Sequence, residues 1–176
     1  MVLPIIYYGN KLLRKKCEPI EVITDEIKSL AEDMIKTMDA QKGIGLAAPQ
    51  IGHPIRLFVL RNYIEDEDSD QEFSDPQVYI NPKILKVSKE TDLEIEGCLS
   101  IPGIREQVER PLTIVIEAMD LEGKLFTEEI FGYNARVRLH ENDHLNGVLF
   151  IDRISIAKKK KIEPVLAQLE KKHNKK

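Results

Sequence analysis

The sequence predicts an α+β domain in which antiparallel β-sheets surround a central helix. Short β-rich runs follow one another closely from residue 78 to residue 131, separated by turn signals and by no helical pattern. Closely spaced strands of this kind favour antiparallel pairing over a parallel, doubly wound sheet. Helical patterns precede and follow these runs. The length of 176 residues suits one compact domain and is short for two.

The composition is that of an ordinary globular protein, with 42% hydrophobic and 32% charged residues. No apolar run approaches the roughly 20 residues that span a bilayer, so we do not expect a membrane protein. Residues 1–17 carry their Lys and Arg after the apolar stretch, which is the reverse of a secretory signal. We therefore expect a cytoplasmic location, with Cys17 and Cys98 reduced.

The charge is unevenly distributed along the chain. The net charge of -4 gives no reason to expect specific nucleic-acid recognition. Residues 158–176 hold eight lysines against Glu163 and Glu170, which makes this basic tail +6 (8 minus 2) and the rest of the chain -10 (-4 minus 6). The tail is thus expected to occupy a different environment from the body.

The first predicted helix covers "TDEIKSLAEDMIKTMDAQKG", residues 24–43. Thr24 or Asp25 can cap it, and Gly43 follows its end. Its apolar residues recur at helical spacing: Ile27, Leu30, Ala31, Met34, Ile35 and Met38. A loop punctuated by Gly and Pro, "GIGLAAPQIGHP", comes next, followed by a strand at 55–60.

Residues 65–72, "EDEDSDQE", hold six acids in eight positions and cannot be buried. We expect a solvated or disordered loop between strands. The predicted strands beyond it are 78–87, 91–101, 104–111, 112–120 and 125–131.

The central helix is predicted over residues 133–146, with Gly147 in a left-handed conformation just past its end. Tyr133, Val137, His140 and His144 fall on one face of it. The chain closes with a helical composition in which Pro164 is expected to kink the helix or to start a new one.

The stretch "HENDH" carries the chemistry of this helix. Histidines at positions 140 and 144 lie one turn apart, so their ring nitrogens can converge on one ion. Glu141 points about 100° away and can reach a water molecule at that ion. A third ligand is needed, and the candidates are Cys17, Cys98, His53 and His173. His173 and Cys17 are weak candidates, because they lie in polar, lysine-rich surroundings. His53 is possible. Cys98 follows Gly97, which has no side chain and so lets another stretch of backbone come close to it.

Three motifs in order then resemble the signature motifs of peptide deformylases: "GIGLAAPQ" at 43–50, "EGCLS" at 96–100 and "HENDHLNG" at 140–147. The likeness extends to the flanking "NP" at 81, "ERP" at 109 and "DRI" at 152. It covers nearly the whole chain. The resemblance implies removal of the N-formyl group from the formylmethionine that begins newly made chains, with release of formate.

The resemblance also implies roles for individual residues. Cys98, His140 and His144 match the ligands of one divalent metal ion, usually Fe2+ in the cell and often replaced by Zn2+ or Ni2+. Glu141 matches the general base. The donors to the developing oxyanion are expected to be the Gln50 side chain and the Leu99 backbone N–H.

Substrate contacts follow from the same resemblance. The expected substrate-binding residues, for the peptide backbone and for the methionine side chain, are Gly43, Ile44, Gly45, Glu96, Gly97, Arg105, Tyr133 and Val137. Many family members carry Gln where this chain has Leu139, which should point away from the metal and alter packing only. Asp143 is expected either to orient a neighbour of the metal site or to form a plain salt bridge. The basic tail is either a solvated helix face or a contact with the ribosome.

Two other functions compete with this interpretation. The HExxH pattern alone would favour a zinc peptidase, which generally takes a third His or Glu further along the chain. A non-catalytic module with a structural zinc would need a fourth protein ligand and would leave Glu141 without a role.

Overall fold

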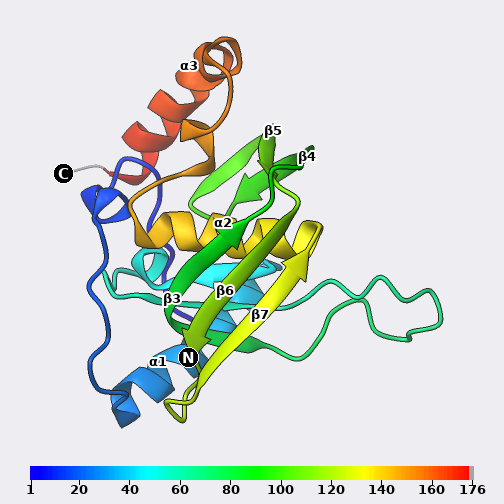
Figure 1. Ribbon diagram of the computed structural model, residues 1–176. Coiled ribbons are helices and arrows are strands. Elements are labelled where there is room, and N and C mark those ends of the chain that lie inside the picture. Colours follow the sequence, from blue (N-terminus) through cyan, green and yellow to red (C-terminus); the bar gives the residue numbers. More distant parts are fainter. Residues whose placement is uncertain (175–176) are drawn as a thin grey trace.

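The computed structural model describes residues 1–174, which form two antiparallel sheets and three α-helices (Figure 1). The larger sheet has the strand order β1-β2-β3-β6-β7, and β4 and β5 form a separate hairpin. The bounds of the strands are β1 Gly45–Ala47, β2 Leu57–Leu60, β3 Gln77–Val87, β4 Thr91–Cys98, β5 Ile101–Pro111, β6 Thr113–Met119 and β7 Leu125–Phe131. All strand pairs are antiparallel, as predicted.

The helix α2, Tyr133–Leu145, is the central helix and packs against strands of both sheets. It has side chains in a hydrophobic cluster that also contains Phe58, Tyr79 and Ile116 of the larger sheet. Leu139 is half-buried and packs against this same cluster, as expected. The prediction of antiparallel sheets around a central HExxH helix is therefore confirmed.

The helix α1, Asp25–Ala40, begins where the sequence predicts, and Gly43 follows its end, as predicted. The Thr24 side chain caps it by accepting a hydrogen bond from the Ile27 N–H. Past its other end, Lys42 takes the left-handed conformation, with φ of 55°. A Cβ on Gly43 would lie 2.9 Å from Leu99 Cδ1, the end of a flexible side chain that would have to shift. The apolar face of α1 packs on β1 and β2.

The helix α3, Ile156–His173, runs through Pro164 as one element. The expectation that Pro164 would start a new helix is wrong. Proline removes one backbone donor, but Ile162 and Leu166 on either side of it are buried in the hydrophobic cluster around Val108 and Phe150. Tertiary packing thus stabilises the helix across this position.

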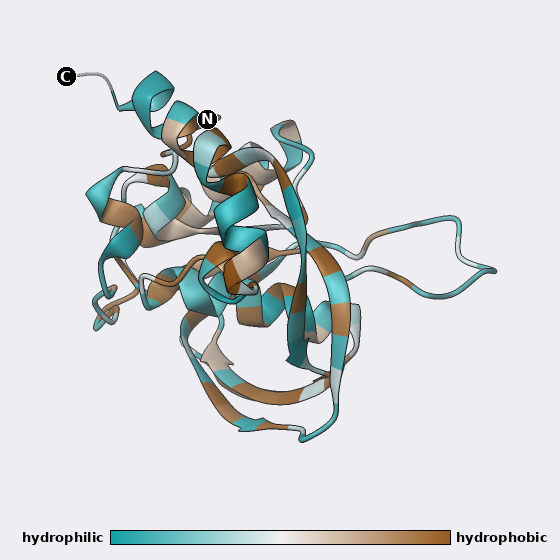
Figure 2. Cartoon of the chain, turned by 90° about the horizontal axis from the view of Figure 1, so that it is seen from above, coloured by the Kyte–Doolittle hydropathy of each residue, from teal (hydrophilic) through white to brown (hydrophobic). Residues whose placement is uncertain are grey.

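The segment between β2 and β3 extends away from the body of the molecule (Figure 1). We call residues 62–74 the acidic loop. Figure 2 shows that it is mostly hydrophilic, and all six acids at 65–72 are exposed. An antiparallel bridge between Tyr63 and Phe73 closes its base. Its predicted exposure is confirmed. Within residues 1–174, no helix is both long and apolar enough to cross a membrane.

Candidate metal centre

The side chains of Cys98, His140 and His144 converge at the point where the β4–β5 hairpin meets α2. Their ligand atoms all lie within 4.8 Å of one another, and Cys98 Sγ is 3.3 Å from His144 Nε2. Cys98 ends β4, at the turn that leads into β5. Over residues 1–174 this is the one group of three such side chains close enough to hold an ion. One thiolate and two imidazoles suit a borderline divalent metal such as iron(II) or zinc.

The other candidates for the third ligand lie elsewhere. Cys17 is buried in the hydrophobic cluster beneath the larger sheet. His173 stacks on the Tyr7 ring with centroids 3.9 Å apart. His53 is exposed in the loop before β2. Of the four candidates, only Cys98 lies beside His140 and His144 in the described part of the chain.

Glu96 holds the His140 ring in place. Its Oε1 accepts a hydrogen bond from His140 Nδ1 at 2.8 Å, so the Nε2 atom of the ring is left for a metal. Arg110 and Arg136 donate to the same carboxylate at 2.8 to 2.9 Å. Burial by itself would raise the pKa of Glu96, but the hydrogen bonds from Arg110 and His140 hold that pKa well below its ordinary value. The Glu96 carboxylate is therefore a buried anion that accepts hydrogen bonds from Arg110, Arg136 and His140.

Asp143 extends this network on the far side of Arg110. Its Oδ2 accepts from Arg110 Nη1 at 2.7 Å, and Arg153 donates to both of its oxygens. Asp143 therefore acts on His140 through Arg110 and Glu96, and its ion pair with Arg153 is part of the same chain of contacts. The salt bridge expected for Asp143 is therefore present.

The Glu141 carboxylate is buried against β1. Its Oε2 atom has no hydrogen-bond partner among the described residues. Burial, its largest influence, raises the pKa of Glu141 to about 7, although the nearby His140 acts to lower it. A Cβ on Gly45 would lie 2.6 Å from Glu141 Oε1, so glycine is needed there for space. Backbone and carboxylate consequently approach closely at this point.

Gln50 is fully buried, and its amide is oriented by the backbone. Its Oε1 accepts from the Ala47 N–H at 2.9 Å. This leaves the Nε2 group to donate to Ser100 Oγ at 3.1 Å and to face Cys98 Sγ at 3.5 Å. The amide donor thus points into the candidate centre.

A groove with a volume of about 320 Å³ leads to these side chains. Its walls come from the segment around β1 and from the β4–β5 hairpin, and they include Gly43, Ile44, Gly45, Gln50, Cys98, Leu99 and Arg105. β1 pairs with β2 on one side only, so its other side borders the groove. An extended peptide could add to this free sheet edge.

A smaller cavity of about 50 Å³ opens beside the metal ligands. Its lining contains four residues that were expected around the methionine side chain, Ile44, Glu96, Tyr133 and Val137. It also contains Gly97, which was expected to contact the substrate, and Arg136. Arg105 does not line this cavity and contributes to the groove instead. Arg136 was not predicted from the sequence. The only indication of its role was that it is a charged residue on a helix predicted to be buried. Arg110 was noted only within a flanking "ERP".

Comparisons with known proteins agree on one family. A family model described as polypeptide deformylase matches residues 2–160. The peptide deformylase of Acinetobacter baumannii is 42% identical over 97% of this chain and 95% of its own length. The peptide deformylase of Afipia carboxidovorans is 46% identical over 90% of each chain.

Solved structures show the same likeness in three dimensions. The peptide deformylase of Thermus thermophilus superimposes with a TM-score of 0.87 at 41% identity, over 98% of this chain and 99% of that one. A plant peptide deformylase gives a TM-score of 0.89 at 37% identity, over 98% and 91% of the two chains. The chain therefore belongs to the peptide deformylase family, the metal-dependent hydrolases that remove the N-formyl group from nascent peptides.

Proposed function

We propose that Cys98, His140 and His144 bind one catalytic ion, iron(II) in the cell, which zinc(II) or nickel(II) can replace. The single observation that supports this most strongly is the convergence of one sulfur and two nitrogen donors within 4.8 Å. Three protein ligands leave a position open on a tetrahedral ion, as catalytic rather than structural sites do. When bound there, the ion supplies Lewis-acid activation of water and of the formyl carbonyl oxygen.

Glu141 is proposed as the general base. Its buried carboxylate, with Oε2 free of other partners, can accept a proton from the attacking water. The same carboxyl group then delivers the proton to the departing amine of methionine. Formate is the other product, because the C–N bond of the formamide breaks as the water oxygen bonds to the formyl carbon.

Gln50 and Leu99 are proposed to stabilise the negative charge that develops on the formyl oxygen. The Gln50 amide is oriented by Ala47, so that its Nε2 group is directed towards Cys98. The backbone N–H of Leu99, which borders the same groove, is the second donor. Fixed donors of this kind are typically worth roughly 100- to 1000-fold in kcat.

The substrate is proposed to bind as an extended strand along the free edge of β1. Gly43, Ile44 and Gly45 would pair with its backbone, while the methionine side chain enters the small cavity next to Val137. The peptide then runs from the metal ligands near Gly45 towards Gly43 and the end of α1.

The test is formate release from a formyl-Met peptide by anaerobically prepared protein, with iron, zinc and nickel compared and metal content measured on each sample. Iron should give the highest kcat/KM, and air should lower it because a thiolate on iron(II) is open to oxidation. Equal activity with zinc would contradict the choice of iron.

The general base is tested with Glu141→Ala, which should lose at least about 100-fold in kcat while keeping its metal. Glu122→Ala, on the exposed turn between β6 and β7, removes the same group and should be fully active. A fully active Glu141→Ala variant would rule out the proposed role.

We further propose that the chain works in the cytoplasm and contacts the ribosome through α3, where formylated chains emerge. The support is the run of exposed lysines on this helix: Lys160, Lys161, Lys171 and Lys172. Deleting the tail would be a poor test, because Ile162 and Leu166 are part of the core.

Replacing those four lysines by Glu tests the contact more cleanly. Co-sedimentation with ribosomes at low salt should fall, while activity on a short formyl peptide should not. The matched control carries the same four charge reversals on exposed lysines outside α3: Lys28, Lys86, Lys89 and Lys124. Equal loss in both variants would show a nonspecific effect of net charge and would contradict a role for α3.

A further inference from the structure

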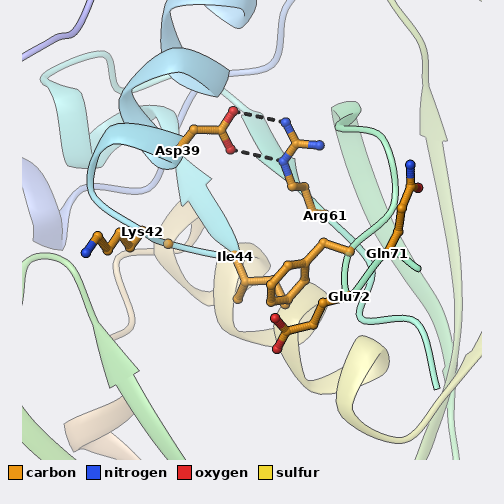
Figure 3. A pocket seen from close by; sticks show the side chains of 8 residues that line it. Asp39, Lys42, Ile44, Arg61, Gln71 and Glu72 are labelled. Carbon is orange, nitrogen blue, oxygen red and sulfur yellow. Dashed lines mark hydrogen bonds and ion pairs between the residues drawn. The ribbon is translucent and has the colours of Figure 1, made fainter. Parts of the chain in front are cut away.

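Two further pockets are larger than the groove that leads to the metal ligands. The first, of about 530 Å³, lies at the base of the acidic loop, beside the paired Arg61 and Asp39 side chains in Figure 3. It shares Lys42, Gly43 and Ile44 with the groove, so it belongs to the proposed path of the substrate. The second, of about 680 Å³, shares no lining residue with the groove. Four segments form it, residues 16–19, residue 56, residues 81–83 and residue 146, and we call it the basic pocket.

Hydrogen bonds join these four segments, so the walls of the basic pocket are fixed. The Asn81 side chain exchanges two hydrogen bonds with the Ile20 backbone, at 2.7 and 2.8 Å. The Arg56 N–H donates to the Glu18 carbonyl, and the Asn81 N–H donates to the Arg56 carbonyl, both at 2.9 Å. Arg56 Nη1 also donates to Asn146 Oδ1 at 3.1 Å. The pocket is therefore preformed, as most small-molecule sites are.

A bulge in β3 places three consecutive residues in the wall of this pocket. The register between β3 and β6 shifts between Ile80 and Lys83, and Asn81 has a left-handed φ of 50°. Asparagine adopts this conformation more readily than most residues, and proline inside a sheet is confined to edges and bulges. Residues 81–83 therefore leave the regular ladder, and all three line the pocket. Bulges of this kind redirect side chains and are over-represented next to functional sites.

The charged side chains in the lining are three cations, Lys16, Arg56 and Lys83, and one acid, Glu18. Their sum is +2 (3 minus 1), although residues 1–157 together carry -10. Within residues 1–174, none of the four takes part in a salt bridge. Among the same residues Arg56 donates only through Nη1, so its Nε and Nη2 atoms are free to donate to a ligand. The pocket thus concentrates positive charge in an acidic body.

The lining matches the parts of a nucleoside phosphate. Arginine and lysine are the side chains that bind phosphate groups. Glu18 can accept hydrogen bonds from ribose hydroxyls, as acidic residues do in dinucleotide sites. Pro19 and Pro82 offer apolar surface for a base, and the volume is within the range of small-molecule sites. A bare phosphate ion would leave the acid and the apolar surface without a role.

We propose that the basic pocket binds a free nucleoside phosphate, with the phosphate on Lys16, Arg56 and Lys83 and the ribose on Glu18. The inference goes beyond the proposed function, because the pocket and the catalytic groove have no lining residue in common. Hydrolysis of a formyl peptide therefore does not test it, and binding has to be measured directly.

The experiment is isothermal titration calorimetry of the metal-loaded full chain with AMP, inorganic phosphate and adenosine, at an ionic strength of about 0.05 M. We expect a Kd for AMP of roughly 10–100 μM, the range of a ligand of this size with ordinary efficiency per atom. Phosphate and adenosine should each bind at least about tenfold more weakly, because each fills only part of the pocket. Equal binding of phosphate and AMP, or no binding of AMP, would overturn the proposal. A six-nucleotide RNA that bound more tightly than AMP would overturn the choice of a free nucleotide.

Paired charge reversals locate the bound AMP. Lys16→Glu combined with Lys83→Glu changes two exposed side chains and should weaken AMP binding at least about tenfold, with hydrolysis of a formyl-Met peptide unchanged. The matched control, Lys28→Glu combined with Lys89→Glu, changes two exposed lysines outside the pocket and should bind AMP as the parent does. Equal loss in both variants would show a nonspecific effect of net charge. Unchanged binding in the pocket variant would place AMP elsewhere, for example on the metal ion, and either result would overturn the proposal.

Glu18→Ala tests the contact with the ribose. The parent should prefer AMP to 2′,3′-dideoxy-AMP by roughly tenfold, the size expected for hydrogen bonds to a charged acceptor. The variant should bind the two nucleotides alike. A Glu18→Ala variant that kept the full preference would overturn the assignment of the ribose to Glu18.

Discussion

Around His140 the carboxylates of Glu96 and Asp143 are buried among arginines, whereas in the acidic loop six carboxylates face solvent. Arg110 and Arg136 are 3% and 2% exposed, and the carboxylates of Glu96 and Asp143 each accept several charged hydrogen bonds. Within the described residues, no acid at 65–72 takes part in a salt bridge. The same residue types are thus paired and buried in one region and solvated in the other. What differs is burial, which sets the cost of leaving a charge without its partner.

The largest expected effect comes from breaking the buried network at its centre. Glu96→Gln leaves Arg110, Arg136 and His140 without their shared anion and should lower the free energy of unfolding by about 3 kcal/mol. Chemical denaturation followed by circular dichroism measures this. Glu67→Gln makes the same change in the acidic loop and should stay within about 0.5 kcal/mol of the parent. Similar losses in both variants would contradict the contrast between the regions.

Tight packing in the buried region gives the next effect. Gly45→Ala places a methyl group against the Glu141 carboxylate, so the proposed general base must move, and kcat should fall about 100-fold. The metal content should stay at the parent level because no ligand is touched. Ser69→Thr adds one methyl group to the acidic loop and should leave kcat unchanged. A fully active Gly45→Ala variant would show that the Glu141 carboxylate does not lie this close to residue 45 in solution.

Salt should have little effect on the buried network. Raising the ionic strength from about 0.05 to about 0.5 M shortens the screening length severalfold, but the destabilisation caused by Glu96→Gln should change by less than about 0.5 kcal/mol, because that network is shielded from solvent ions. A large change with salt, measured by the same denaturation experiment, would show that solvent ions reach the network.

The smallest effect concerns Cys17, an ionisable group buried outside the network. Burial raises its pKa to about 11, so its neutral thiol is favoured in the folded state. Its contribution to stability is complete below the unfolded thiol pKa of about 9 and is lost as the pH rises towards 11. Between pH 8 and pH 10 the parent should lose up to about 1 kcal/mol more stability than Cys17→Ala. Parallel pH profiles for the two proteins would contradict this.

The elements of the fold could be predicted wherever one local pattern dominated. The helix at α1, the strand at β6 and the left-handed glycine after α2 all correspond to what is found. A prediction failed where tertiary contacts outweigh a local rule. Pro164 stays within α3 because the residues around it are anchored in the core.

The candidate site was predictable in its ligands and not in its supporting contacts. Two histidines at helical spacing lie side by side whatever the fold around the helix. The position of Cys98 instead depends on how the β4–β5 hairpin meets α2, so only the family resemblance could identify Cys98 as the third ligand. Glu96 was expected as a wall of the methionine pocket. It does line that cavity, but its hydrogen bonds join residues 96, 110, 136 and 140, whose proximity no local sequence pattern reveals.

The open side of β1 also bears on how this protein avoids aggregation. An unpaired strand is a template on which other chains can add, and long exposed ones lead to sheet-to-sheet association. β1 is only three residues long. It borders a groove, with the β4–β5 hairpin forming the opposite wall. One narrow strand can enter there, while the broad edge of another folded molecule cannot. The enzyme can therefore keep a sheet edge permanently available to nascent chains without polymerising through it.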